Sequence, residues 1–349
     1  PLQISLISLL RVVCLNLWNK IMKQKILITD YVWPSIEPEK KILEDAGYEV
    51  VVPPDDSEST LIRYVGDVHG IIFCFGKVTS KVLENAKNCM VVSRYGIGVD
   101  NIDLVKATEL GLVVTNVPDY CTDEVADHAL GMLLSLNKNM ITHTRQVVAG
   151  NWNKITLDFP GHRLSDSILG IVGYGRIGKA LEKKAHDLGM KVLVNSRSLP
   201  ENSQTKFGKS VSMDTLLSTS NFISLNLPLN KDTKNIIGKN EIQKMKKNSI
   251  LINCSRGGLV DENAVAEALS TGHLFGAGFD VLENVSSTMN SFLFKQENVI
   301  ITPHSAFYSE ESTLDLEIKT ANEVVRVLSG KMPKNLVNKD VIGKSRIGL

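Results

Sequence analysis

The stretch 167–180 constrains the fold of this chain more than any other part of it. The apolar run ILGIV at 168–172 leads into Gly173, Gly175 and Gly178, which have the spacing G-x-G-x-x-G. A helical apolar pattern follows as far as Gly189, and the run MKVLV at 190–194 comes next. This order of patterns predicts a strand, a tight turn, a helix and a second strand, which together have the length of a βαβ unit.

Each glycine of this turn has its own physical task. Gly173 permits the sharp bend, Gly175 lets a pyrophosphate approach the backbone, and Gly178 lets the helix pack closely on the strand. The helix N-terminus then offers unpaired N–H groups and a partial positive charge to the phosphates. We therefore predict a dinucleotide site, with a glycine turn that binds no ligand as the alternative. Ala180 stands where a P-loop needs Ser or Thr for magnesium, so nucleoside triphosphate chemistry is not expected.

The end of the second strand favours a phosphorylated cofactor. An NAD site usually places Asp or Glu roughly 20 residues after the first glycine, where it binds the ribose hydroxyls. Here the chain reads NSRS at 195–198, with no carboxylate. The hydroxyl of Ser196 and the guanidinium of Arg197 are donors that suit a phosphate. We expect a preference for NADP(H) over NAD(H); the alternative is that Arg197 is a solvated turn residue and both cofactors bind.

The composition indicates which partners to expect. A chain of 349 residues with 43% hydrophobic residues can bury two ordinary cores, so we expect two domains. A net charge of +1, without a long block of one sign, gives no electrostatic reason to expect nucleic acid or a membrane surface. Five cysteines without a CxxC pair indicate neither a disulfide framework nor a zinc site, and they fit a reducing cytoplasm. We expect small-molecule partners and no metal.

The rest of the chain also has an α/β pattern. Between Lys25 and Val114 short apolar runs alternate with helical patterns, which is typical of a parallel sheet. The run NVPD at 116–119 breaks this pattern, one or two helices are expected over 122–148, and a helix at about 309–328 should return the chain to the first domain. Because Met22 leads directly into the first strand, residues 1–21 are expected to be an extension outside the fold.

Functional side chains are expected where the later strands end. Strands predicted at 222–226, 249–253, 274–279 and 299–302 should end in the ligand crevice of an open sheet. Arg256 offers parallel donors to a carboxylate, and it can polarise a neighbouring carbonyl. The ordinary pKa of a histidine side chain lies near neutrality, so His304 suits proton donation to an alkoxide. On spacing alone, a surface arginine and a capping histidine remain the alternative.

Another loop and two further histidines need an interpretation. The stretch 93–100 contains Gly96, Ile97 and Gly98 just beyond a predicted strand, and its N–H groups are suited to an anion. The alternative is a glycine turn that only precedes a helix. His128 and His143 lie on the helical stretch without partners at ligand spacing, so structural or surface roles are expected for them.

Ordered motifs in the chain resemble the D-isomer-specific 2-hydroxyacid dehydrogenases. They are GYGRIG at 173–178, NCSRGGLVD at 253–261, FDV at 279–281 and TPH at 302–304, within a match from 25 to 338. The resemblance implies an α/β fold of two Rossmann-like or flavodoxin-like domains. In it, a dinucleotide-binding domain at 120–306 is inserted into a discontinuous substrate domain at 22–119 and 307–349. It also implies a homodimer and the reversible NAD(P)H-dependent reduction of a small 2-oxo acid to a D-2-hydroxy acid.

The same resemblance implies roles for individual residues. Arg256 would bind the substrate carboxylate and carbonyl, His304 would be the general acid and base, and the amides of residues 96–98 would hold the carboxylate. Arg176 and Ile177 would lie at the pyrophosphate of the cofactor, and Asp280 would lie near the nicotinamide amide. Four further residues would lie along the cofactor: Leu227, Pro228, Cys254 and Ser255. The NSRS sequence at 195–198 resembles that of the NADPH-using glyoxylate and hydroxypyruvate reductases.

The chain departs from the family at one catalytic position. Val285 stands where the family has a catalytic Glu, Ser286 replaces the following proline, and Glu283 corresponds to a different place in the motif. Without a carboxylate partner, the pKa of His304 should fall relative to a paired site. We therefore expect a slower reductase with an acid-shifted rate profile. The stretch 302–310 also resembles the C-terminal-binding-protein corepressors, so a dinucleotide-sensing binding protein with vestigial activity is the alternative function.

Overall fold

The computed structural model describes residues 23–153, 160–283 and 292–349, and these divide into two compact units. Unit 1 contains the described residues as far as Tyr120 together with Glu310–Leu349, and unit 2 contains Cys121–Ser309. The expected extension 1–21 and the departure at Val285 lie outside the described residues. Unit 1 is therefore formed from two separate stretches of the sequence.

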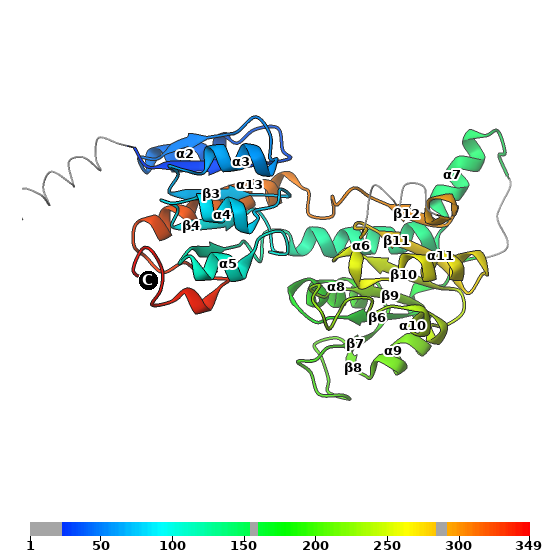
Figure 1. Cartoon of the computed structure of the whole chain (residues 1–349). Coiled ribbons are helices and arrows are strands. Elements are labelled where there is room, and N and C mark those ends of the chain that lie inside the picture. The colour runs from blue at the N-terminus through cyan, green and yellow to red at the C-terminus, as the bar shows by residue number, and fades with distance from the viewer. Residues whose placement is uncertain (1–22, 154–159, 284–291) are drawn as a thin grey trace, which may run out of the picture. The chain divides into compact units, whose positions relative to one another are not determined.

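Unit 1 is a five-stranded parallel sheet with the strand order β2-β1-β3-β4-β5 (Figure 1). This is the flavodoxin-like order 2-1-3-4-5. Strands β3 and β4 are buried along their whole length, as expected for central strands of a parallel sheet. The strands are β1 (Lys25–Ile28), β2 (Glu49–Val51), β3 (Gly70–Phe73), β4 (Val91–Arg94) and β5 (Val113–Thr115), and the helices are α2 (Glu37–Asp45), α3 (Glu58–Tyr64), α4 (Ser80–Asn85), α5 (Leu104–Glu109) and α13 (Glu310–Leu328).

The C-terminal stretch is integrated into this first unit. Helix α13 packs against α2, β3 and β4, and it buries Leu316, Val324 and Val327. The side chain of Asn338 accepts a hydrogen bond from the Val114 amide at 2.8 Å and donates to other groups near β5. A short 3₁₀ helix, η4 (Lys339–Val341), follows. The core of unit 1 is thus completed by residues that come after unit 2 in the sequence.

Unit 2 is a seven-stranded parallel sheet with the order β12-β11-β10-β9-β6-β7-β8 (Figure 1). The strand order reverses between β6 and β9, which makes this the topological switch point of a Rossmann-like sheet. The strands are β6 (Ile168–Val172), β7 (Lys191–Asn195), β8 (Lys209–Ser210), β9 (Phe222–Leu225), β10 (Ser249–Asn253), β11 (Leu274–Phe279) and β12 (Val299–Ile301). The prediction of two α/β domains with parallel sheets is confirmed.

Helices cover both faces of the second sheet. Alternate residues of β10 enter different cores: Leu251 packs in one cluster, and Ile250 and Ile252 pack in the other with residues of α6 and α8. Helix α6 packs against α8, β10 and β11. The helices are α6 (Thr122–Asn137), α7 (Met140–Val148), α8 (Arg176–Asp187), α9 (Met213–Thr219), α10 (Lys239–Lys244) and α11 (Glu262–Ser270), with 3₁₀ turns η1 (Leu164–Asp166), η2 (Gly257–Leu259) and η3 (Phe292–Lys295).

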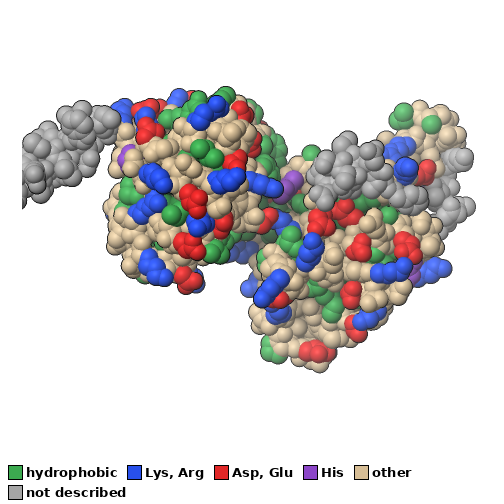
Figure 2. Space-filling view, in the orientation of Figure 1, with side chains coloured by type: hydrophobic (Ala, Val, Ile, Leu, Met, Phe, Trp, Pro, Cys, Tyr) green, Lys and Arg blue, Asp and Glu red, His purple; other side chains and the backbone are tan. Residues whose placement is uncertain are grey.

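The surface carries charges of both signs. On the face seen in Figure 2, Lys and Arg side chains are interspersed with Asp and Glu side chains on each unit. Within the described ranges, no helix has the length and apolar character needed to cross a membrane.

Candidate active site

The candidate site residues of unit 2 follow strands of one parallel sheet. Because all seven strands are parallel, the segments that follow their carboxyl ends meet at one edge of the sheet. The glycine turn follows β6, residues 196–197 follow β7, residues 227–228 follow β9, residues 254–256 follow β10, Asp280 follows β11, and His304 lies just beyond β12. Residues far apart in the sequence are thereby placed at the edge where such sheets bind ligands.

The glycine turn lies at the switch point, and each glycine has a different local geometry. Gly173 has φ +97°, and a Cβ there would lie 2.3 Å from the Asn226 carbonyl oxygen at the end of β9. A Cβ on Gly178 would lie 2.4 Å from the Gly173 carbonyl oxygen. A Cβ on Gly175 would meet open space, and α8 begins at the next residue, Arg176. Gly173 thus lies at a bend that its positive φ permits, Gly178 packs as closely as expected, and the start of α8 is left accessible.

A buried carboxylate supports this turn and was not identified from the sequence. The side chain of Glu182 on α8 is 1% exposed and accepts a hydrogen bond from the Tyr174 hydroxyl at 2.5 Å. It also accepts from the Thr205 hydroxyl and from the Phe207 amide. Burial, together with the hydrogen bond to Glu182, raises the pKa of Tyr174. Glu182 therefore joins the glycine turn to the loop before β8.

Residues 195–198 form an exposed turn beside the glycine turn. The Asn195 carbonyl accepts a hydrogen bond from the Gly173 amide at 2.8 Å, which joins the two segments. Ser196 and Ser198 share a hydrogen bond of 2.9 Å between their hydroxyls. The guanidinium of Arg197 is exposed, with Nη1 3.6 Å from Oδ2 of Asp232. A hydroxyl and a guanidinium thus lie in the turn that follows β7.

The segment after β10 is held by the side chain of Asn253. Its Oδ1 accepts from the Ser255 amide at 3.0 Å, and its Nδ2 donates to the Arg256 carbonyl at 2.9 Å. The Ser255 hydroxyl donates to the Leu225 carbonyl on β9 at 2.7 Å, and Leu227 packs against the core. Burial, with Asp280 nearby as a second cause, raises the pKa of the Cys254 thiol. Cys254 is therefore a thiol rather than a nucleophilic thiolate.

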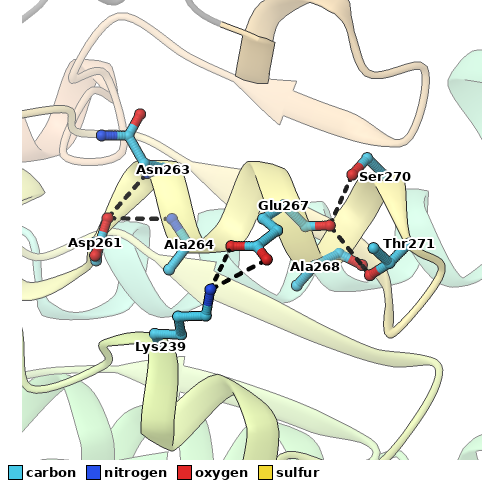
Figure 3. A network of polar contacts seen from close by, with 8 residues as sticks. All are labelled: Lys239, Asp261, Asn263, Ala264, Glu267, Ala268, Ser270 and Thr271. Carbon is cyan, nitrogen blue, oxygen red and sulfur yellow. Dashed lines mark hydrogen bonds and ion pairs between the residues drawn. The ribbon is translucent and has the colours of Figure 1, made fainter.

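Arg256 lies between this segment and helix α11. Its Nη1 donates to the Ser255 carbonyl at 2.7 Å. The next residue is a glycine because a Cβ on Gly257 would lie 2.1 Å from the backbone of Leu282. The motif then ends at Asp261, whose carboxylate caps α11 by accepting from the amides of Asn263 and Ala264 (Figure 3). The same figure shows Lys239 of α10 paired with Glu267 of α11, which joins these two helices.

Glu283 is the acidic residue nearest in sequence to Val285, and its contacts are with residues of other segments. Glu283 accepts a hydrogen bond from Lys234 Nζ at 2.9 Å, and its amide donates to Glu262 at 2.7 Å. Glu283 thus forms an ion pair with a lysine.

His304 has an unusual backbone conformation. Its φ is +56°, in the left-handed region that residues other than glycine rarely adopt. Its amide donates to the Asp280 carbonyl at 2.9 Å, and its ring meets the Phe307 ring edge to face at 6.4 Å. Such backbone strain persists only where the surrounding structure holds it, and it is common at active sites.

Asp280 is the residue that holds this turn. Its side chain is 1% exposed, and Oδ1 accepts from the Thr302 hydroxyl at 2.6 Å and from the Ser305 amide at 2.8 Å. Its Oδ2 accepts from the Ala306 amide at 3.0 Å. The carboxylate therefore binds groups on both sides of His304. The sequence analysis placed Asp280 near the nicotinamide, and it did not foresee this role in the turn.

His128 also belongs to this network. The sequence analysis found no partner for it, but its Nε2 lies 2.9 Å from Oγ1 of Thr302 and 3.7 Å from Oδ1 of Asp280. The two partners are far from His128 in the sequence, so residue spacing could not show the contact. The one available signal was helical periodicity, because His128 lies beside the buried Val125, Ala129 and Met132 on the inner face of α6.

The glycine loop of unit 1 has a more restricted set of donors than expected. Gly96 has φ +139°, and its amide already donates to the Arg94 carbonyl at 2.9 Å. The Ile97 carbonyl accepts from Asn116 at 2.7 Å. Arg94 itself is a nearly buried cation at the end of β4, and its guanidinium contacts the rings of Phe73 and Phe75. The sequence analysis did not single out Arg94.

The sheet order, the glycine turn at its switch point and the strand-end residues define a dinucleotide-dependent enzyme, and comparisons with known proteins give the family. Residues 130–306 match the model of the D-isomer specific 2-hydroxyacid dehydrogenase, NAD binding domain. Over 335 residues, the chain is 38% identical to the glyoxylate reductase of Thermococcus litoralis, covering 93% of this chain and 99% of the relative.

Solved structures agree with this match. The D-lactate dehydrogenase of Aquifex aeolicus, complexed with NAD and lactic acid, has a TM-score of 0.81 at 27% identity, covering 90% of this chain and 99% of that chain. The acyclic imino acid reductase Bsp5, in complex with NADPH and D-Arg, has a TM-score of 0.79 at 26% identity, covering 90% and 100%.

The chain belongs to the D-isomer specific 2-hydroxyacid dehydrogenase family. It is an NAD(P)-dependent oxidoreductase that acts on CH–OH groups, and its reaction is the reduction of 2-oxo acids to 2-hydroxy acids. The match to the NAD-binding model falls within unit 2.

Proposed function

We propose that this protein is a reductase of small 2-oxo acids, with glyoxylate as the first substrate to test and NADPH as the preferred cofactor. The observation that carries the proposal is the turn held by Asp280, which fixes His304 in a left-handed conformation at the ligand edge of the sheet. Glyoxylate is chosen because the relative from Thermococcus litoralis is a glyoxylate reductase. The identity of the acid and the cofactor preference are thus parts of the proposal.

The residues of unit 2 fit a bound dinucleotide. The exposed start of α8 and the open space at Gly175 leave room for a pyrophosphate against backbone N–H groups, and Arg176 and Ile177 begin that helix. Leu227, Pro228, Cys254 and Ser255 follow the adjoining strands β9 and β10, along the rest of the proposed cofactor path. The nicotinamide, when bound, supplies the hydride that reduces the substrate.

In the proposed reaction, Arg256 binds the carboxylate and the carbonyl oxygen of the 2-oxo acid through its parallel donors. His304 would give a proton to the carbonyl oxygen as C2 is reduced by the cofactor's hydride and that oxygen takes up the electron pair of the C=O bond. For the glycine loop of unit 1, we assign the expected anion binding to the amides of Ile97 and Gly98, because the Gly96 amide already donates to the Arg94 carbonyl. The product is the 2-hydroxy acid, and we propose the D isomer.

The exposed turn after β7 supports the preference for NADPH. Ser196 and Arg197 offer a hydroxyl and a guanidinium where a ribose 2′-phosphate would lie, and the similar reductase Bsp5 was solved with NADPH. Asp232 lies 3.6 Å from the guanidinium, so the phosphate would compete with this carboxylate for Arg197. The similar D-lactate dehydrogenase of Aquifex aeolicus was solved with NAD, so both cofactors must be measured.

The first experiment measures the oxidation of NADPH and of NADH, in separate runs, with glyoxylate, hydroxypyruvate, pyruvate and longer 2-oxo acids. Turnover of glyoxylate with NADPH, abolished in His304→Gln, is the expected result. Turnover in which His304→Gln keeps full activity would contradict the role given to His304. Tight cofactor binding without turnover of any acid would favour a dinucleotide-sensing binding protein.

The replacement at Val285 leads to a further expectation within this proposal. Val285 lies outside the described residues, so the expectation rests on the sequence alone. A glutamate close to a histidine stabilises the charged form of the ring, so a glutamate introduced at position 285 should keep a neighbouring catalytic histidine protonated at higher pH. Val285→Glu is expected to raise kcat/KM above pH 7. The pH at which kcat/KM falls on the alkaline side should be higher in this variant.

A further inference from the structure

We propose that His128 is a positioning residue for His304, acting through the Thr302 hydroxyl and the Asp280 carboxylate. This inference rests on the proposed role of His304 as proton donor. His128 lies on helix α6, and its ring contacts the Thr302 hydroxyl and lies near the Asp280 carboxylate.

The direction of the hydrogen bonds follows from counting protons. The Thr302 hydroxyl has one proton, and it donates that proton to Oδ1 of Asp280 at 2.6 Å. Its oxygen must therefore accept in the 2.9 Å contact with Nε2 of His128. His128 thus carries a proton on Nε2 and is the first donor of a chain that ends at a carboxylate. Hydrogen bonds arranged in such a chain strengthen one another.

Asp280, at the end of this chain, is bonded to the backbone of His304 and of the two residues that follow it. The Asp280 carboxylate accepts from the amides of Ser305 and Ala306, and the Asp280 carbonyl accepts from the amide of His304. A left-handed histidine needs such contacts to keep its conformation. Loss of the His128 donor would leave the Thr302 hydroxyl free to rotate and would weaken one of the two bonds to Oδ1.

The start of the chain is fixed by packing. His128 lies on α6, which packs against α8, β10 and β11 and has Ala129 and Met132 buried next to it. Both the neutral Nε2–H form and the imidazolium of His128 donate through Nε2, so the chain does not depend on the charge of this ring. A neutral donor of similar reach should therefore replace it. Replacement by a neutral donor distinguishes two roles for His128. One is positioning through its hydrogen bond to Thr302, and the other is compensation of the negative charge of Asp280, whose Oδ1 lies 3.7 Å from Nε2.

The test compares His128→Leu with His128→Gln, and Thr302→Val with Thr302→Ser, in the full chain with NADPH and the best 2-oxo acid. Misplacing a catalytic group by about 1 Å costs on the order of 100-fold in rate. We expect kcat to fall roughly 10- to 100-fold in His128→Leu and Thr302→Val, with KM for both substrates changed by less than about threefold. His128→Gln and Thr302→Ser should keep kcat within about threefold of the original protein, because each retains the polar group.

The solvent deuterium isotope effect on kcat gives a readout that general loss of structure would not move. It should increase in His128→Leu, because transfer of the proton from a misplaced His304 becomes slower relative to the other steps. In a double variant, His128→Leu with Thr302→Val, the losses should not add, since both changes break the same chain.

The outcomes separate the two proposals. Equal kcat in His128→Leu and His128→Gln, or losses confined to KM, would overturn the positioning role while His304→Gln remains inactive. Activity that survives His304→Gln would instead overturn the proposed function itself. If His128→Leu does not fold, the Thr302 pair decides, because Thr302→Val that retains full kcat would also overturn the inference.

Discussion

At the scale of single residues, backbone geometry determines which glycines of the cofactor turn tolerate a side chain. Gly173→Ala would place a methyl group 2.3 Å from the Asn226 carbonyl oxygen, at φ +97°. We expect it to lower the free energy of unfolding by about 3 kcal/mol, measured by urea denaturation. Gly175→Ala is the matched control, because its Cβ meets open space; it should fold normally and weaken only cofactor binding. Equal stability of the two variants would contradict the packing argument.

Arg197 is the residue on which the cofactor preference depends. Arg197→Ala should raise the KM for NADPH about tenfold, since it removes a charge-assisted hydrogen bond to the 2′-phosphate, and leave the KM for NADH unchanged. Asp232→Asn should lower the KM for NADPH, because the guanidinium would lose the carboxylate 3.6 Å away. The measurement is kcat/KM for each cofactor. An equal change in kcat/KM for NADPH and for NADH would show that Arg197 does not bind the 2′-phosphate.

At the scale of secondary-structure elements, helices α2 and α13 bring two acidic side chains into the core of unit 1. Glu39 is fully buried and Glu317 is 4% exposed. The Tyr95 hydroxyl donates to Oε1 of Glu39 at 2.8 Å. Burial, with the charge of Glu39 as the second cause, raises the pKa of Glu317 to about 7. Two carboxyl groups in one apolar region thus disfavour each other's ionisation.

This pair leads to a pH-dependence of stability with a definite sign. Glu317 binds its proton more tightly in the folded chain than in the unfolded one, so its stabilisation is complete below about pH 4.5 and is lost as the pH rises through about 7. Glu317→Gln should therefore gain stability relative to the original protein by roughly 3 kcal/mol between pH 5 and pH 8, in urea denaturation. Glu311→Gln on the exposed side of α13 is the control and should show no such gain.

The long, strongly patterned elements were predictable, and several short ones were not. Strands with continuous apolar runs, such as β6 and β10, and the helix α13 follow from their own residues. Helices α3, α9, α10 and α11 were not identified individually from the sequence. Their caps were the available signal: Ser57, Ser212 and Asp261 each accept a hydrogen bond from an amide of the first turn.

At the scale of the whole molecule, we propose that helix α7 forms part of a homodimer interface. None of its residues is buried in the chain, although Met140, Val147 and Val148 are apolar and Val148 is 83% exposed. Val148→Asp should shift the protein from dimer to monomer in light scattering, because it places a charge in an apolar contact. Val105→Asp is the control, since Val105 on α5 is 71% exposed in the other unit. A monomeric original protein would contradict the proposal.

The sequence by itself determined the parallel sheets, the glycine turn and the residues that follow each strand. These features depend on local patterns: continuous apolar runs form buried strands, and only glycine fits φ +97° beside a carbonyl oxygen. Parallel strands then place Arg256, Asp280 and His304 at the same edge of the sheet without further information.

Only the tertiary structure decided how these residues are held. The contacts of His128 with Thr302, of Glu182 with Tyr174 and the loop before β8, and of Glu39 with Tyr95 join elements that no spacing rule relates. A hydrogen bond needs two groups about 3 Å apart in a fixed direction, and that depends on how whole helices pack on a sheet. Residue type and order therefore indicate which groups perform the chemistry, while packing sets the conformation in which they perform it.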